Sequence, residues 1–140
     1  MSDAQNVHMS DAQNVEVIRG AYDALARGDI SAVLAMFTQE TEWTEAEGYP
    51  YAGTYKGPDA ILQGVFMRLG TEWDGYQAVP DEFVAQGDKV VVLGHYSGTY
   101  KRTGRSFRAP FAHVYTVRNG KIERFVQHTD TAVVQTALQS

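Results

Sequence analysis

The sequence has no cysteine among its 140 residues, so disulfides, thiolate metal ligands and cysteine nucleophiles are excluded. It lacks any apolar run near the ~18 residues that a membrane span needs. No signal peptide is visible, which favours a cytoplasmic protein. Basic residues are few, with 12 Lys and Arg against 17 Asp and Glu, and those at 101–108 have no interleaved aromatic stretch. Neither nucleic acid nor a membrane is therefore an expected partner.

Motifs for bound metals and nucleotides are missing as well. The four histidines show no HxH or HxxxH spacing, and no acid–histidine cluster has the spacing of metal ligands. The chain has no phosphate-binding loop, no dinucleotide fingerprint and no GxSxG elbow for a serine nucleophile. We therefore expect no metal, no cofactor and no covalent intermediate.

The chain does have the size and composition of one globular domain, with 44% hydrophobic and 21% charged residues. Its N-terminus starts twice, because MSDAQNVH at 1–8 is followed at once by MSDAQNVE at 9–16. An artificial duplication, a tag or a second start explains this better than a structural repeat. We assign residues 9–140 to a single domain and leave residues 1–8 outside it.

Apolar residues at helical spacing predict three helices in the first half of the chain. The first opens with a capping box of Ser10 and Gln13, and Asp29 caps the second, whose inner face includes Phe37. The predicted helices cover residues 10–28, 29–37 and 58–70. A short strand is expected between the last two, around Glu42–Thr44.

After Gly70 the apolar period becomes that of strands. Four long antiparallel strands and a final helix are predicted, over Glu72–Gln86, Lys89–Lys101, Arg105–Arg118, Lys121–Thr129 and Thr131–Leu138. Gly75 and Pro80 inside the first of these strands indicate an edge or a bulge. Helices on one face of a curled antiparallel sheet make an α+β domain with a deep conical space.

Several stretches resemble the NTF2-like superfamily, specifically its SnoaL-like and ketosteroid-isomerase-related members. They are GDISAVLAMF, EWTEAEGYPYAGTYKGPDAI, APFAHVYTVRNGKI and FVQHTDTA, and the likeness covers Asn14 to Leu138. The resemblance implies a cone-shaped α+β barrel around an apolar cavity, and a homodimer formed through the outer sheet face. It implies no single activity, because this fold carries many chemistries.

Positions of the family's functional residues fall on several residues here. The proton-shuttling aspartate of ketosteroid isomerase falls on Glu45, whereas its oxyanion-binding tyrosine and aspartic acid fall on Ala21 and Ala112. The histidine of SnoaL-type cyclases matches His113, and the acid of those cyclases falls on Gln127.

Glu45 is the first candidate for catalysis. Trp43 lies two residues before it on a strand, so both side chains point the same way, and an indole beside a carboxylate would raise the pKa of that carboxyl by removing water. The alternative is a solvated loop containing all three glutamates of EWTEAEGY. We expect Glu45 inside, with Glu42 and Glu47 in solvent.

His113 is the second candidate, and strand alternation leaves its direction open. The isomerase match would turn Ala112 inward and His113 outward, whereas the cyclase match would turn His113 inward, the arrangement we prefer. An alternative dyad of His128 and Asp130 is weighed against a simpler role for Asp130 as the cap of the last helix, which we favour.

Two functions remain open. The first is a cofactor-independent enzyme that uses Glu45 for isomerisation, cyclisation, dehydration or epoxide hydrolysis on a small hydrophobic molecule. The second is a dimeric protein that binds such a molecule without turnover. In both, the expected ligand-binding residues are Tyr22, Trp43, Tyr49, His95, Phe125 and Gln127.

Overall fold

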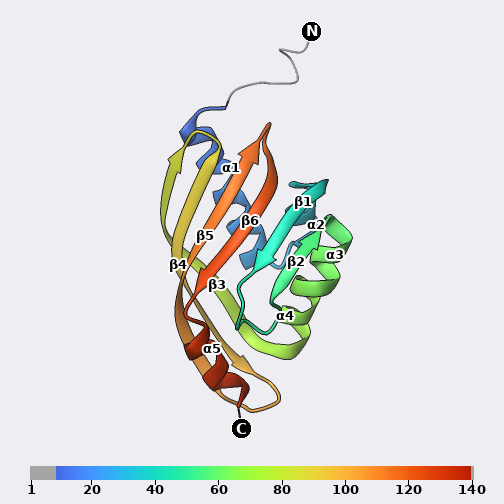
Figure 1. Ribbon diagram of the computed structural model, residues 1–140, viewed down its shortest axis with the longest axis vertical. Coiled ribbons are helices and arrows are strands. Elements are labelled where there is room, and N and C mark those ends of the chain that lie inside the picture. The colour runs from blue at the N-terminus through green and yellow to red at the C-terminus, as the bar shows by residue number, and fades with distance from the viewer. Residues whose placement is uncertain (1–8, 140) are drawn as a thin grey trace.

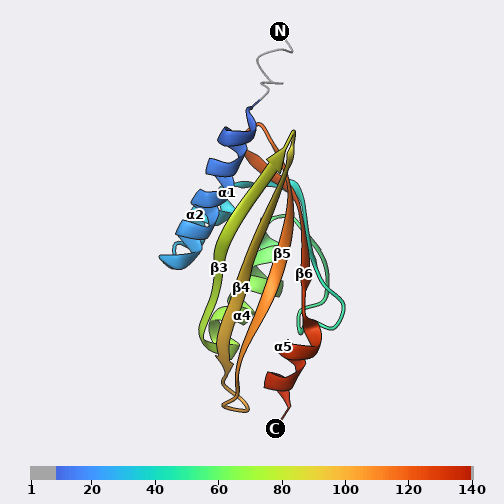
Figure 2. The same cartoon turned by 90° about the vertical axis from the view of Figure 1, so that its left-hand side faces the viewer.

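The computed structural model describes residues 9–139, so the prediction about residues 1–8 lies outside the described part of the chain. A strongly curved sheet carries helices on one face, and the short C-terminal helix lies at the far end of the molecule from the start of α1 (Figures 1 and 2). This confirms the α+β architecture. The elements in order are α1 (Asp11–Ala26), α2 (Ile30–Leu34), β1 (Phe37–Glu45), β2 (Gly53–Lys56), α3 (Pro58–Ile61), η2 (Leu62–Phe66), α4 (Met67–Glu72), β3 (Trp73–Gln86), β4 (Lys89–Tyr100), β5 (Ser106–Arg118), β6 (Lys121–Thr129) and α5 (Thr131–Leu138).

The sheet is mixed, and this corrects the prediction of a purely antiparallel one. Its strand order is β2-β1-β6-β5-β4-β3, with β1 parallel to β6 and every other pair antiparallel. β1 is longer than expected, because Phe37 begins this strand instead of ending a helix. β2, formed by the four residues GTYK, was not predicted. The predicted meander of β3 to β6 is confirmed.

Local capping chemistry fixes the first helices. The hydroxyl of Ser10 accepts the Gln13 amide while the Gln13 side chain accepts the Ser10 amide, which is the predicted capping box. Gly28 follows α1 with φ 75°, a left-handed conformation that suits glycine. The carboxylate of Asp29 accepts the Ala32 amide at 3.2 Å and so starts α2. α1 packs against β3 and β4.

The third predicted helix is interrupted by a π-helical turn, η2, between α3 and α4. Gly64 lies in this turn against the ring of Tyr55 from β2, where an added Cβ would lie 2.2 Å from a ring carbon. Only glycine permits so close an approach. The turn places Val65 and Phe66 on the inner side of the fold, and π-turns often accompany functional sites.

β3 is the edge strand predicted from Gly75 and Pro80, and it is irregular at both places. Its pairing with β4 shifts register between Asp74 and Gln77 and again between Pro80 and Glu82. Gly75 takes φ 61° in the first irregularity. The extra residue breaks the two-residue alternation, so Trp73 and Tyr76 both turn toward the interior.

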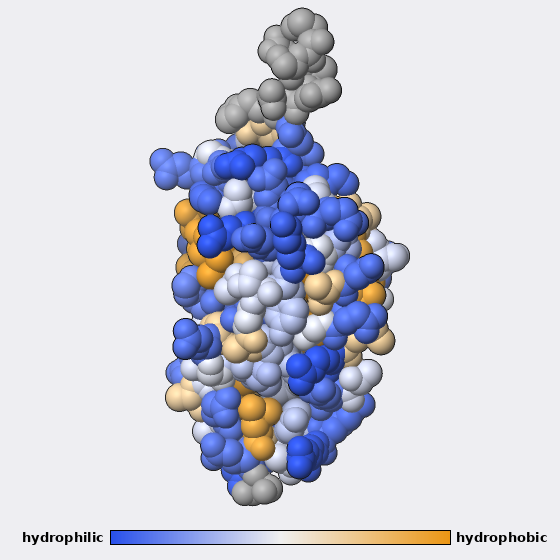
Figure 3. All heavy atoms as spheres, turned by 45° about the vertical axis from the view of Figure 1, so that its right-hand side comes forward, coloured by the Kyte–Doolittle hydropathy of each residue, from blue (hydrophilic) through white to orange (hydrophobic). Residues whose placement is uncertain are grey.

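Aromatic side chains fill much of the space between helices and sheet. Trp43 stacks on Phe125 with ring centroids 3.7 Å apart, and Phe111 stacks on His113 at 3.8 Å. The outer surface seen in Figure 3 is mostly polar, with apolar side chains in small separate patches. The interior is not filled completely, and the remaining space is the candidate site.

Candidate functional site

A cavity of about 540 Å³ lies between the inner sheet face and the helices. Helices α1, α2, η2 and α4 and strands β1, β3, β4, β5 and β6 all contribute to its wall. Most of this wall is apolar or aromatic. The aromatic residues are Tyr22, Trp43, Phe66, Trp73, Tyr76, Tyr96, Tyr115 and Phe125, and the polar residues among the others are Glu45, Gln77, His113 and Gln127.

Glu45 is the only carboxylate in the wall of the cavity among the described residues. Its side chain is buried with 5% exposure, and the indole N–H of Trp43 donates to Oε2 over 2.9 Å. Within residues 9–139, no hydrogen bond reaches Oε1. Burial raises the pKa of Glu45 to about 7, against a smaller lowering by the Trp43 hydrogen bond. Glu42 and Glu47 are exposed, so the three glutamates lie where the sequence placed them.

Replacing Trp43 with phenylalanine should raise the pKa of Glu45 above about 7. The variant keeps an aromatic ring on Phe125 but removes the one hydrogen bond that the carboxylate receives from residues 9–139. A bond to a charged group contributes about 1.5–3 kcal/mol. Titration of the Glu45 carboxyl carbon by NMR measures the change. A pKa that stays the same or falls would show that Trp43 does not stabilise the ionised form.

His113 lies inside the cavity wall, in the direction preferred from the sequence. Phe111, His113 and Tyr115 are buried on the inner face of β5, while Ala112 is only partly buried on the other. The pairing of β5 with β4 runs without a register shift, so the alternation of side chains along β5 is undisturbed. The arrangement implied by the isomerase match, with Ala112 inward, is therefore wrong.

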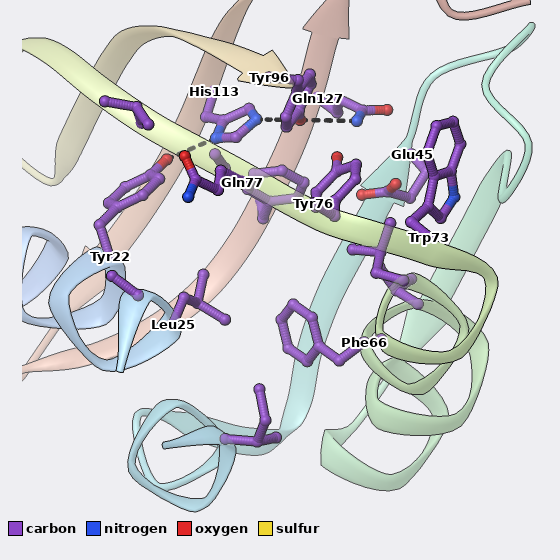
Figure 4. Close-up of a pocket in the computed structure, with 18 of the residues that line it drawn as sticks. Tyr22, Leu25, Glu45, Phe66, Trp73, Tyr76, Gln77, Tyr96, His113 and Gln127 are labelled. Carbon is purple, nitrogen blue, oxygen red and sulfur yellow. Dashed lines mark hydrogen bonds between the residues drawn. The ribbon is translucent and has the colours of Figure 1, made fainter. Parts of the chain in front are cut away.

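A continuous line of hydrogen bonds runs through His113 (Figure 4). The Tyr115 hydroxyl donates to the Tyr22 hydroxyl oxygen over 2.9 Å. The same Tyr22 oxygen lies 2.5 Å from Nδ1 of His113. On the other side of the ring, Nε2 is hydrogen-bonded to Tyr96. The Gln127 amide donates to Tyr96 over 2.8 Å. We call Tyr115, Tyr22, His113, Tyr96 and Gln127 the tyrosine–histidine chain.

Every titratable member of the tyrosine–histidine chain is neutral near pH 7. Burial lowers the pKa of His113 well below 6.5, with a smaller lowering from the charge of His128. Burial is also the main cause that raises the pKa values of Tyr22, Tyr96 and Tyr115. The site therefore combines one carboxyl group that titrates near neutrality with hydroxyls that stay protonated.

Tyr49 lies behind this wall, not in it. It is buried, its hydroxyl is hydrogen-bonded to that of Tyr76, and Tyr76 itself lines the cavity. Trp43, Tyr22, Phe125 and Gln127 do line the cavity as predicted.

His95 and the proposed His128–Asp130 pair lie away from the cavity. His95 precedes the inward-facing Tyr96 on β4, so it points outward, where Nδ1 lies 3.1 Å from the Asp81 carboxylate. Asp130 accepts the Val133 amide at 3.2 Å and caps α5, and His128 is exposed. The His128–Asp130 dyad is therefore not formed, and Asp130 has the capping role that we favoured.

The aromatic wall residues that the predicted ligand-binding set did not include are Phe66, Trp73, Tyr76, Tyr96 and Tyr115. Trp73 and Tyr76 are three residues apart, which strict strand alternation would place on opposite faces. The usable signal was Gly75, since a glycine inside a strand often marks a bulge. Helical spacing predicts Phe66 on the inner face of its helix, but it does not predict that this side chain borders a cavity.

Within residues 9–139, no three His, Asp or Glu side chains come together as a possible metal site. No helix in the same part of the chain is long and apolar enough to cross a membrane.

Comparison with known proteins places this architecture among characterised folds. The family model for the SnoaL-like domain matches residues 18–125. An NTF2-like protein from Burkholderia thailandensis is 45% identical, with a TM-score of 0.89, and the match covers 94% of this chain and 100% of that one. The structure of TerC, co-crystallised with polyporic acid, is 31% identical with a TM-score of 0.82, covering 91% and 99%. An uncharacterised protein of Mycobacterium tuberculosis is 24% identical over 128 residues, covering 91% and 97%.

Proposed function

Because the chain belongs to the SnoaL-like family, with an NTF2-like fold, we propose that it is a cofactor-independent proton-transfer enzyme acting on an apolar, ring-containing carbonyl compound. One observation carries this proposal: the Glu45 carboxylate is buried in the cavity wall, its Oε1 has no hydrogen-bond partner among the described residues, and its pKa is raised to about 7. A carboxyl group tuned to neutrality is an efficient general base.

The reaction starts with Glu45 in its ionised form. Oε1 takes a proton from the carbon next to the carbonyl, the C–H electron pair forms the enolate double bond, and negative charge moves to the carbonyl oxygen. A hydroxyl of the tyrosine–histidine chain, which remains protonated, then donates a hydrogen bond to that oxygen. Isomerisation, aldol-type cyclisation and dehydration share this first step, and epoxide hydrolysis would use the same base on water.

The character of the cavity supports a flat, largely apolar ligand. Eight of the residues that line it are Phe, Tyr or Trp, and planar rings stack well against such side chains. A volume of about 540 Å³ falls within the range of small-molecule sites. The co-crystallisation of the relative TerC with polyporic acid supports a small organic ligand here as well.

Deuterium exchange at the carbon next to the carbonyl of 2-tetralone, followed by mass spectrometry, tests the proposal directly. We expect exchange faster than in buffer, with a rate that rises with pH and levels off above the Glu45 pKa of about 7. The rise occurs because the base must be ionised. If the protein binds the ketone but exchange is no faster than in buffer at any pH, the result would contradict an enzymatic role toward apolar, ring-containing carbonyl compounds.

A binding protein without turnover is the second candidate, and one observation favours it. The hydroxyls of Tyr22, Tyr96 and Tyr115 all take part in hydrogen bonds within the protein, which use most of their donor and acceptor capacity. This function predicts that removing the Glu45 carboxylate changes the affinity for 2-tetralone and leaves its exchange rate equal to that in buffer.

We also propose that the chain forms a homodimer through the outer sheet face. Val84, Val91, Val114 and Val126 pair side by side across β3, β4, β5 and β6 and form an apolar row, with Val84 51% exposed. A partner subunit would remove this row from water. Sedimentation at micromolar concentration should show a dimer, and Val91→Glu should convert it to a monomer that retains the fold. A wild-type monomer under these conditions would exclude this interface.

A further inference from the structure

The tyrosine–histidine chain contains one more proton than its hydrogen bonds can use. The Ala46 amide donates to Oε1 of Gln127 at 2.9 Å, which directs the Gln127 N–H group to the Tyr96 oxygen. Tyr96 thus already accepts one hydrogen bond, just as Tyr22 accepts one from Tyr115. A neutral imidazole has one N–H group and one acceptor nitrogen, so it donates to one tyrosine and accepts from the other.

Two arrangements satisfy all of these contacts. In the first, Tyr96 donates to Nε2, the Nδ1–H group donates to Tyr22, and the Tyr22 hydroxyl proton is left over. In the second, Tyr22 donates to Nδ1, the Nε2–H group donates to Tyr96, and the Tyr96 hydroxyl proton is left over. Both tyrosines line the cavity, so the remaining proton is available to a ligand in either case.

We propose that His113 is a positioning residue whose tautomer assigns the free hydroxyl proton to Tyr96 when Glu45 is ionised and to Tyr22 when Glu45 is protonated. This inference rests on the proposed function, because it names the donor that meets the ligand oxygen. It stands on geometry, since Tyr96 lies on the same side of the His113 ring as Glu45 and Tyr22 lies on the other side (Figure 4).

The Glu45 charge acts unequally on the two tyrosines. Tyr96 and Gln127 lie on the Glu45 side of His113, and Tyr22 lies on the opposite side (Figure 4). After burial and Tyr49, the Glu45 carboxylate is the next cause that raises the pKa of Tyr96, whereas the charges acting on Tyr22 come from Tyr115 and Tyr96. A negative carboxylate therefore attracts an O–H dipole at Tyr96 more strongly than one at Tyr22.

Other titratable groups also face His113 and have to be separated from Glu45. One of them is the exposed His128, whose neighbour across the strands is Ala112 and whose charge adds to the lowering of the His113 pKa. The groups around His113 are Tyr22 from α1, Glu45 from β1, Tyr76 from β3, Tyr96 from β4, Tyr115 from β5 and His128 from β6.

The proposed tautomer favours ligands in which a hydrogen-bond acceptor lies close to the acidic carbon. An acceptor oxygen close to the carbon that Glu45 deprotonates would meet a donor that is already in place when the base is charged. Compounds whose carbonyl oxygen lies next to the acidic carbon, as in 2-tetralone, fit this arrangement. The matching hydrocarbon tetralin has no acceptor oxygen, so the free hydroxyl proton does not contribute to its binding.

Nitrogen NMR of protein labelled at histidine with ¹⁵N tests the inference without turnover. Between pH 5 and 9, the Nδ1 and Nε2 signals of His113 should move in opposite directions, with the midpoint of the Glu45 carboxyl titration. The response should disappear in Glu45→Gln and in Tyr96→Phe, and persist in His128→Asn, the matched control for the other nearby charge. Saturating 2-tetralone should increase the Nε2–H form relative to tetralin.

Three results would overturn the inference. Both nitrogen signals moving together toward imidazolium values would mean that His113 itself takes up a proton. Nitrogen signals that stay constant while the Glu45 carboxyl titrates would show that the tautomer does not depend on the charge of Glu45. Deuterium exchange of 2-tetralone would still test the proposed enzymatic function separately. A response that is lost in His128→Asn and kept in Glu45→Gln would show that the charge of His128, not that of Glu45, controls the tautomer of His113.

Discussion

Replacing Glu45 with glutamine is expected to lower the rate of deuterium exchange of 2-tetralone by about 10²–10⁴-fold, the usual contribution of a general base. Glutamine has nearly the same shape and can still accept the Trp43 indole N–H group through its amide oxygen. It cannot take a proton from carbon. The loss should therefore appear in turnover, while the affinity for tetralin, which has no acidic carbon, stays close to that of the wild type.

Glu42→Gln is the matched control for this experiment. Glu42 lies on the same strand, three residues before Glu45, and is exposed. It changes the net charge by the same amount without altering the cavity, so exchange should remain at the wild-type rate. An equal loss in both variants would indicate a general electrostatic effect, and no loss in Glu45→Gln would remove Glu45 from the mechanism.

The second large effect is on stability. Burial raises the Glu45 pKa from 4.5 to about 7, so the folded protein binds this proton more tightly than the unfolded chain does. The contribution is complete below pH 4.5 and is lost as pH rises through about 7. The difference corresponds to ~3 kcal/mol in the free energy of unfolding.

Urea unfolding of wild type and Glu45→Gln at pH 4.5 and pH 8 isolates this contribution. Other groups titrate in both proteins and cancel in the comparison. Between the two pH values, the difference in unfolding free energy should shift by ~3 kcal/mol in favour of the variant. A difference that does not depend on pH would mean that the Glu45 carboxyl has an ordinary pKa in the folded protein.

Much of this site followed from local rules in the sequence. The capping box at Ser10 and the long strands each depend on neighbours within a few residues, so spacing alone predicts them. Spacing also puts Glu45 and Trp43 on one face of a strand, but the inward direction of that face was predicted with the family match at Glu45. The direction of His113 needed one further choice between two family matches, and the uninterrupted pairing of β5 with β4 determines it.

The remaining features depend on contacts between distant segments. The parallel pairing of β1 with β6 places Trp43 beside Phe125, and no local sequence pattern predicts this pairing. β2 is a four-residue strand, GTYK, that pairs with β1, and so short a segment gives little signal in the sequence. His95 was misplaced because histidine and tyrosine alternate along β4, and the sequence alone does not say which of them faces inward.

The pairing of β1 with β6 also has a consequence for the order in which the molecule is made. β1 is held on one side by β2 and on the other by β6, and the contact from Ala46 to Gln127 spans 81 positions of the chain. During synthesis from the N-terminus, β1 emerges long before β6. Contacts of such sequence separation form late, because the chain has to close a large loop first. Until the last strand arrives, the wall beside Glu45 is incomplete and its carboxylate faces water. The newly made chain therefore carries an ordinary surface acid there, which becomes a neutral-range base only when the sheet is finished.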